Sequence, residues 1–210
     1  MLLMSIVCWW CIVVGFFNTA LRARGYSYTR TPVKTSLFYL SACVITIGIF
    51  APMHMSWQPL TPLGSIPFIA IIGTLIFLDR YIATTFPSAD VQLMRNASMA
   101  KYTDILLQQL LIFLLFVSVQ DMSTTMLWTV SMFTGIFGLL HAPVFFIMPR
   151  HIAWTFFIAS CAGGIIFATL YSTQFHSAPY ITFAIHALFY STLRACEHNS
   201  DSWVRYMERD

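Results

Sequence analysis

The segment 104–120, DILLQQLLIFLLFVSVQ, decides the fold, because 12 of its 17 residues are large and apolar. A run of about 20 predominantly apolar residues can cross the hydrocarbon core of a bilayer as a helix. Similar runs recur along the chain, in which 58% of the 210 residues are hydrophobic and 9% are charged. Soluble domains carry about 25% charged residues. The sequence therefore predicts an all-α polytopic helix bundle, an integral, multi-pass membrane protein without a sizeable domain outside the lipid.

Hydropathy predicts seven transmembrane helices. They are expected near 1–20, 35–55, 65–84, 104–120, 124–148, 152–173 and 178–195. This divides the chain into three N-terminal helices with a cytoplasmic loop (1–103), a four-helix core (104–195) and a cytoplasmic tail (196–210). The first helix is expected to be an uncleaved anchor, because its positive charges follow the apolar run instead of preceding it.

Basic residues segregate between the predicted connections. All 11 lysines and arginines lie in the first, third and fifth connections and at the C-terminal end, and the other connections contain none. The positive-inside rule then predicts an N-terminus outside and a C-terminus in the cytoplasm. Because topology accounts for these charges, no nucleic-acid partner is expected. Within the third connection, residues 87–101 are predicted either as a short amphipathic helix on the cytoplasmic surface or as a solvated loop.

The five cysteines are expected to be buried thiols without metal or redox chemistry. Cys8 and Cys11 form a single CxxC, which is weak evidence on a helix within lipid, and the other three are widely spaced. Small residues at four-residue intervals on the sixth helix, Ser160, Gly164 and Ala168, predict close packing against a neighbouring helix.

A second small-residue pattern lies on the fifth helix. Gly135 and Gly138 are expected to bring this helix close to its neighbour. Pro143 cannot donate a backbone hydrogen bond, so the carbonyl of Leu139 is expected to be free to accept one inside the bundle.

Four strongly polar side chains lie inside predicted spans: Gln108 and Gln109, His141, and His186. Such residues are costly in lipid and often functional. At 1.5 Å per residue, each histidine lies about 12–13 Å before the following basic boundary, and Gln108 about 10 Å beyond Lys101. All four therefore fall at one depth, which predicts a common polar pocket opening toward the cytoplasm. The alternative for each histidine is a neutral imidazole bonded to an adjacent helix.

Two short motifs around this layer resemble those of a known family. Phe137 to His141 reads FxxxH and is followed by Pro143, and His186 begins a motif that ends at Tyr190. These residues are similar to the FxxxH and HxxxN motifs of the CAAX protease and bacteriocin-processing (CPBP, or Abi) family of intramembrane proteases. The resemblance covers about residues 104–192 and implies a membrane-embedded hydrolase fold, with His141 and His186 at the active site.

The chain departs from the family pattern at the residues that carry the chemistry. The family's EExxxR motif aligns with Gln108, Gln109 and Phe113, and its HxxxN asparagine with Tyr190. The resemblance implies a glutamate that activates water, whereas a glutamine side chain cannot accept the proton. We therefore expect a pseudoenzyme with altered or lost peptidase activity, which binds a peptide or a membrane-protein partner within the lipids and needs no cofactor.

Three alternatives remain open. The first is an active peptidase in which Asp104, one turn before Gln108, replaces the missing glutamate and works with His141 and His186. The second is a carrier in which the two histidines ligate haem or a metal. The third is a non-catalytic structural subunit of a membrane complex.

Overall fold

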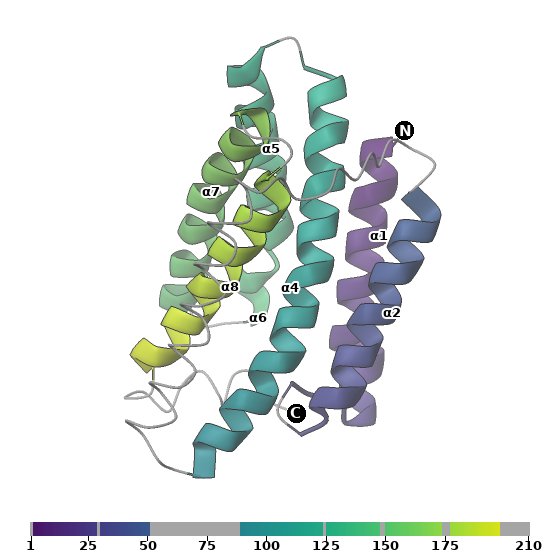
Figure 1. The fold of residues 1–210 in the computed structure, drawn as a ribbon, viewed down its shortest axis with the longest axis vertical. Helices are drawn as coiled ribbons and strands as arrows, with labels where there is room; N and C mark the ends of the chain where they lie inside the picture. Colours follow the sequence, from purple (N-terminus) through teal and green to yellow (C-terminus); the bar gives the residue numbers. More distant parts are fainter. Residues whose placement is uncertain are drawn as a thin grey trace.

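The computed structural model of this protein describes residues 2–28, 30–50, 89–123, 125–147, 150–173 and 177–197. In this part of the chain the fold is an all-α bundle (Figure 1), which confirms the predicted fold class. Five helices are long and apolar enough to cross a membrane: Leu2–Arg24, Pro32–Phe50, Ala100–Asp121, Met126–Phe146 and Ala153–Thr173. A shorter apolar helix covers Ala178–Tyr190. The predicted third span, 65–84, and residues 198–210 lie outside the described residues.

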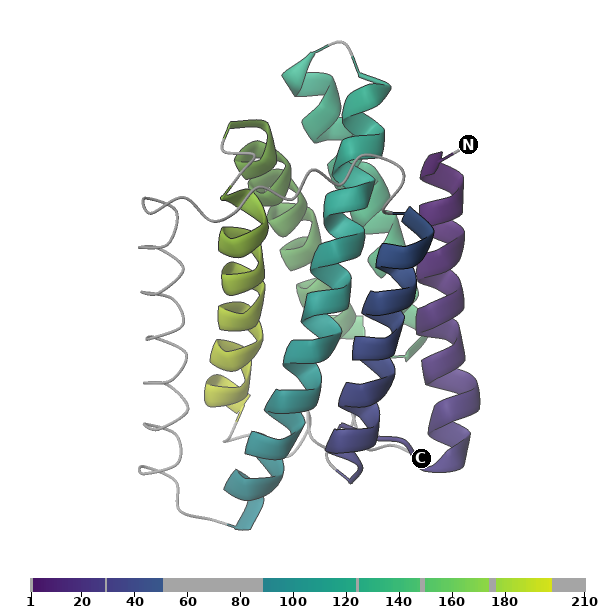
Figure 2. The same cartoon turned by 45° about the vertical axis from the view of Figure 1, so that its right-hand side comes forward.

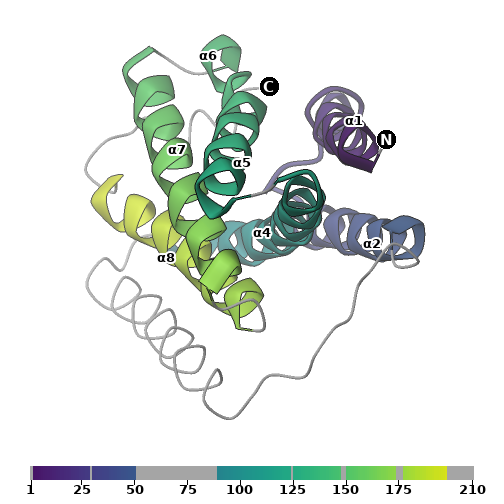
Figure 3. The same ribbon diagram turned by 90° about the horizontal axis from the view of Figure 1, so that it is seen from above.

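The helix α4 (Ala89–Asp121) lies in the middle of the bundle. The helices around it are α1 (Leu2–Phe16), α2 (Pro32–Phe50), α5 (Met126–His141), α6 (Val144–Ile147), α7 (Arg150–Thr173) and α8 (Ala178–Glu197). Figure 3 shows α1 and α2 on one side of α4, and α5, α7 and α8 on the other. Residues of α4 therefore reach both halves of the bundle.

The long α4 corrects the predicted start of the fourth helix at 104. The helix begins at Ala89 and continues without interruption to Asp121, so the stretch 89–101 is neither a loop nor a separate surface helix. Ala100 is fully buried and Lys101 is 9% exposed. Ala100 and Lys101 are thus packed inside the bundle, which brings a lysine into its interior.

The fifth predicted span, 124–148, is interrupted before Pro143. Helix α5 ends at His141, and α6 begins at Val144. The carbonyl of Leu139 accepts a 3.1 Å hydrogen bond from the backbone N–H of Ala142. The prediction of a free Leu139 carbonyl was therefore wrong, because the chain satisfies it locally as the helix ends.

Helices α5 and α7 pack closely where the sequence places small residues. A Cβ atom added at Gly164 would lie 3.2 Å from the Cα of Thr134, and one at Gly138 would lie 3.0 Å from the Sγ of Cys161. A Cβ at Gly135 would meet no atom within 4 Å. The close approach is thus confirmed for Gly138 and Gly164, whereas Gly135 does not take part in it.

The outer faces of the helices carry large apolar side chains. Phe146 is 92% exposed, Leu127 78% and Val44 69%. Cys8 and Cys11 also lie on such a face and are exposed, while Cys43 is buried. The prediction of buried thiols was therefore wrong for the CxxC pair. Faces of this composition suit a hydrocarbon environment rather than water.

Several basic residues of the described part of the chain lie at the same end of the bundle, as the directions of the helices show. Figures 1 and 2 show that α1, α5 and α8 run downward, whereas α2, α4 and α7 run upward. Arg24 follows α1, Lys34 opens α2, Lys101 lies in the first half of α4, and Arg150 opens α7. The segregation of charge seen in the sequence is therefore also a segregation in space.

Candidate functional site

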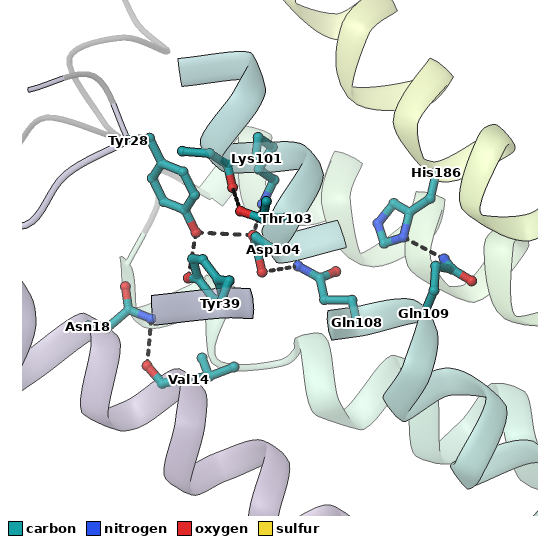
Figure 4. Close-up of polar contacts among 11 residues, drawn as sticks. Val14, Asn18, Tyr28, Tyr39, Lys101, Thr103, Asp104, Gln108, Gln109 and His186 are labelled. Carbon is teal, nitrogen blue, oxygen red and sulfur yellow. Dashed lines mark hydrogen bonds and ion pairs between the residues drawn. The ribbon is translucent and has the colours of Figure 1, made fainter. Parts of the chain in front are cut away.

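The chain reversal after α1 positions the first residue of the site. At Phe17–Leu21 the helix widens into a π turn, where Asn18 donates a 2.9 Å hydrogen bond to the carbonyl of Val14 (Figure 4). The helix then ends at Gly25, whose φ of +79° is the left-handed conformation that favours glycine. The connection turns back toward the bundle, and Tyr28 is buried with 7% exposure.

Tyr28 connects the N-terminal helices to α4. Its hydroxyl donates a 3.0 Å hydrogen bond to Oδ2 of Asp104. The hydroxyls of Tyr28 and Tyr39, from α2, lie 2.7 Å apart. Because the Tyr28 proton points to the carboxylate, Tyr39 is the donor to Tyr28. Burial first, and then the charge of Asp104, raise the pKa of the Tyr28 phenol well above its usual value of 10.0, so this donor stays protonated.

Asp104 also forms an ion pair with a lysine of its own helix. Nζ of Lys101 lies 2.5 Å from Oδ2 of Asp104, and Nε2 of Gln108 donates a 2.8 Å hydrogen bond to Oδ1. Lys101 lies over two rings, 5.4 Å from the centroid of Tyr28 and 4.3 Å from that of Tyr190. We call Lys101, Asp104, Tyr28, Tyr39, Gln108 and Tyr190 the lysine cluster.

The lysine cluster provides partners for two charges that are expensive to bury. Asp104 is 5% exposed, and its carboxylate accepts three hydrogen bonds, from Tyr28, Lys101 and Gln108. A buried ion pair is tolerated only when its geometry is good and its remaining lone pairs are satisfied. The cluster therefore has the composition that an intramembrane ion pair requires.

A second polar contact lies on the α8 side of α4. Nε2 of Gln109 lies 2.9 Å from Nδ1 of His186, as Figure 4 shows. Both residues are buried, with 4% and 8% exposure, and Oε1 of Gln109 has no hydrogen-bond partner. With the amide as donor, Nδ1 of His186 is an acceptor and its Nε2 carries the proton. His186 is thus a neutral imidazole held by a neutral amide.

His141 lies near this contact without joining it. Its Nδ1 donates a 2.8 Å hydrogen bond to the carbonyl of Phe137, one turn earlier on α5. The ring of Phe137 lies 4.5 Å from that of His141 and 6.1 Å from that of Phe167, which lies 6.0 Å from His186. A series of ring contacts through Phe137 and Phe167 therefore links the two histidines.

The six residues predicted for the site fall into three groups. Gln109 meets His186, Gln108 meets Asp104, and His141 bonds to its own helix. Tyr190 connects the first two groups, because it stacks on His186 at 5.3 Å and also lies beneath Lys101. The predicted layer therefore contains two bonded pairs rather than four converging polar groups.

Three members of the site, Lys101, Tyr28 and Tyr39, were not predicted from the sequence. Lys101 was assigned to the membrane boundary, although its spacing of three residues from Asp104 is that of a helical ion pair. The two tyrosines follow from no local pattern, because the contact between Tyr28 and Asp104 joins residues 76 positions apart. Only the spacing of Lys101 and Asp104 could have indicated this cluster.

Within the described ranges, no three His, Cys, Asp or Glu residues lie close enough together to hold a metal ion. No protein-family model, curated protein or solved structure matches this chain.

Proposed function

We propose that this chain is a multi-pass membrane protein of CPBP-like architecture that binds a peptide or membrane-protein partner and does not hydrolyse peptides. The observation that carries the proposal is the contact between Gln109 and His186, buried between α4 and α8. In the family that the sequence resembles, a glutamate at this position activates water. A glutamine there keeps the histidine oriented but supplies no base.

The chemistry of the amide supports a binding role. A general base must take a proton at the reacting atom, and a neutral carboxamide does not do so. The Gln109 amide still offers an unpartnered carbonyl oxygen, and the Nε2–H of His186 is a donor. Together these groups can accept and donate hydrogen bonds to an uncharged polar group such as a peptide bond.

The alternative peptidase would use Asp104 as its base. Asp104 accepts hydrogen bonds from Tyr28, Lys101 and Gln108, so taking a proton would disrupt this arrangement. Its carboxylate also faces the lysine cluster, whereas His186 is bonded to Gln109. These contacts favour the inactive form over a peptidase based on Asp104.

We further propose that the N-terminus lies outside and the C-terminal end in the cytoplasm, with lipids as the main neighbours of the outer faces. The shared end of the bundle at which Arg24, Lys34, Lys101 and Arg150 lie supports this orientation. A structural subunit of a larger complex would be distinguished by stoichiometric partners that co-purify with the chain.

The test is peptide cleavage by the purified protein in liposomes, with a library of fluorogenic peptides. We expect no turnover by the natural sequence and measurable turnover by the Gln108→Glu, Gln109→Glu double variant. Gln120→Glu is the control for the type of substitution, because it makes one such Gln-to-Glu change at an exposed position of α4. Turnover by the natural sequence that is lost in His186→Ala would contradict the proposal. If Asp104→Asn also abolishes this turnover, the result would favour the peptidase based on Asp104.

A further inference from the structure

The surroundings of the Lys101 ammonium group form a compact site of their own. Its Nζ atom contacts the carboxylate of Asp104 and lies over the rings of Tyr190, at 4.3 Å, and Tyr28, at 5.4 Å. These three residues come from α4, from α8 and from the connection between α1 and α2. We call Tyr28, Tyr190 and Asp104 the ammonium cage.

We propose that the ammonium cage is a binding site for an alkylammonium group, and that Lys101 occupies it in this structure as an internal ligand. Two aromatic faces within about 6 Å of the nitrogen are the arrangement by which proteins recognise primary and methylated ammonium ions. The carboxylate adds charge complementarity, and burial keeps water from competing with it.

The cage does not depend on Lys101 for its shape. Tyr28 is held by Tyr39 and Asp104, and the second oxygen of Asp104 is held by Gln108. Tyr190 is held by its stacking on His186, at 5.3 Å. If Lys101 left, the other cage residues would keep these partners. A buried carboxylate without a cation is costly, so the vacated cage favours another ammonium ion.

Lys101 is able to leave because of its place on α4. It is the second residue of the span Ala100–Asp121, at the end of the bundle where other basic residues lie. A lysine near the end of an apolar span can extend its flexible stem toward the membrane surface, even though α4 itself begins twelve residues earlier at Ala89. Exchange between Lys101 and an external ammonium group therefore requires a side-chain movement and leaves α4 in place.

Two sources can supply such a group: the ethanolamine or choline headgroup of a lipid, and a soluble amine. Both present the same chemistry to the cage. Lipid composition separates them, since vesicles of phosphatidylglycerol alone contain no headgroup ammonium.

The first experiment uses the fact that the chain has two lysines, Lys34 and Lys101. Reductive methylation with ¹³C-formaldehyde is followed by NMR in phosphatidylglycerol vesicles. Lys34 is exposed and is the internal control. We expect Lys101 to react at least about tenfold more slowly, as expected for a cation held by aromatic and carboxylate contacts. Tetramethylammonium chloride does not react with formaldehyde. It should increase the methylation rate of Lys101 and leave that of Lys34 unchanged.

The second experiment asks whether the empty cage binds an ammonium ion. Lys101→Ala should lower the melting temperature by about 5–10 °C. Addition of n-propylammonium, which supplies the three carbons and the ammonium group that alanine lacks, should restore it saturably, whereas 1-propanol and sodium chloride should not. The Lys101→Ala, Tyr190→Leu double variant should show no such recovery. If phosphatidylethanolamine restores stability without added amine, the headgroup is the source.

Equal methylation of the two lysines, or no effect of tetramethylammonium on Lys101, would overturn the proposal. If Lys101→Ala does not fold, the methylation experiment on the natural sequence decides the question by itself.

Discussion

Gln109 and His186 lie 77 positions apart in the chain, yet a hydrogen bond of 2.9 Å joins Nε2 of the amide to Nδ1 of the ring. This bond connects α4 to α8 at a buried position. Gln109→Leu would remove the donor and leave Nδ1 unpaired. We expect the unfolding free energy to fall by about 1–3 kcal/mol, measured by denaturant titration in detergent micelles. Gln120→Leu, at an exposed position of the same helix, is the control and should change it by less than about 0.5 kcal/mol.

The ion pair of Lys101 and Asp104 should show strong coupling in a double-mutant cycle. Either single change, Lys101→Met or Asp104→Leu, leaves one buried charge without its partner and should cost about 3–5 kcal/mol. The double variant removes both charges and should cost clearly less than the sum of the two. Additive losses, measured by the same titration, would show that the two side chains do not interact in the membrane.

Alkaline pH should destabilise the protein through Tyr28. Its pKa is raised in the folded state, so the folded protein holds this proton more tightly than the unfolded chain, whose tyrosines titrate near pH 10. The resulting stabilisation is complete below about pH 10 and is lost as the pH rises toward the folded pKa. Unfolding measured from pH 8 to pH 12 should show a shallower decline in Tyr28→Phe. The same decline in Tyr28→Phe as in the natural sequence would contradict this assignment, and Tyr26→Phe is the matched control.

Two adjacent glycines of α7 should respond oppositely to alanine. A Cβ at Gly164 would lie 3.2 Å from the backbone of Thr134, whereas one at Gly163 meets no atom within 4 Å. Gly164→Ala should therefore cost about 1–3 kcal/mol, because helices α5 and α7 must move apart. Gly163→Ala should be neutral or stabilise the helix by up to about 1 kcal/mol. Equal melting temperatures of the two variants would show that α5 and α7 are not in close contact.

The proposed orientation can be tested by cysteine labelling. In a cysteine-free background, Ser123→Cys lies between α4 and α5, at the opposite end of the bundle from Arg24→Cys. An impermeant maleimide added to intact cells should label Ser123→Cys. Arg24→Cys should react only after permeabilisation. The reverse labelling pattern would show that the orientation in the membrane is opposite to the one proposed.

The sequence predicted the apolar helices well, because hydrophobic length alone defines a span. The helices expected at 152–173 and 178–195 correspond to Arg150–Thr173 and Ala178–Glu197. The start of α4 could not be found in this way, since residues 89–100 contain no long apolar run. The end of α5 was missed because hydropathy continues through Pro143 although the helix does not.

The depth of the polar residues along their helices could be predicted from the sequence, but their hydrogen-bond partners could not. The common level of Gln109 and His186 follows from counting residues along two helices, and the structure joins them. The partners of Asp104 depend on Tyr28, which reaches it through a reversal of the chain after Gly25. Contacts across such a distance in sequence follow from helix packing, which hydropathy does not specify.

The spacing of Lys101 and Asp104 also matters for biogenesis. A lysine or an aspartate alone opposes entry of a helix into the bilayer by about 2.5–3.5 kcal/mol at its centre. These two residues are one turn apart, so they neutralise each other as soon as α4 is helical. Once helical, α4 therefore carries no net charge at this level even before Tyr28 contacts Asp104.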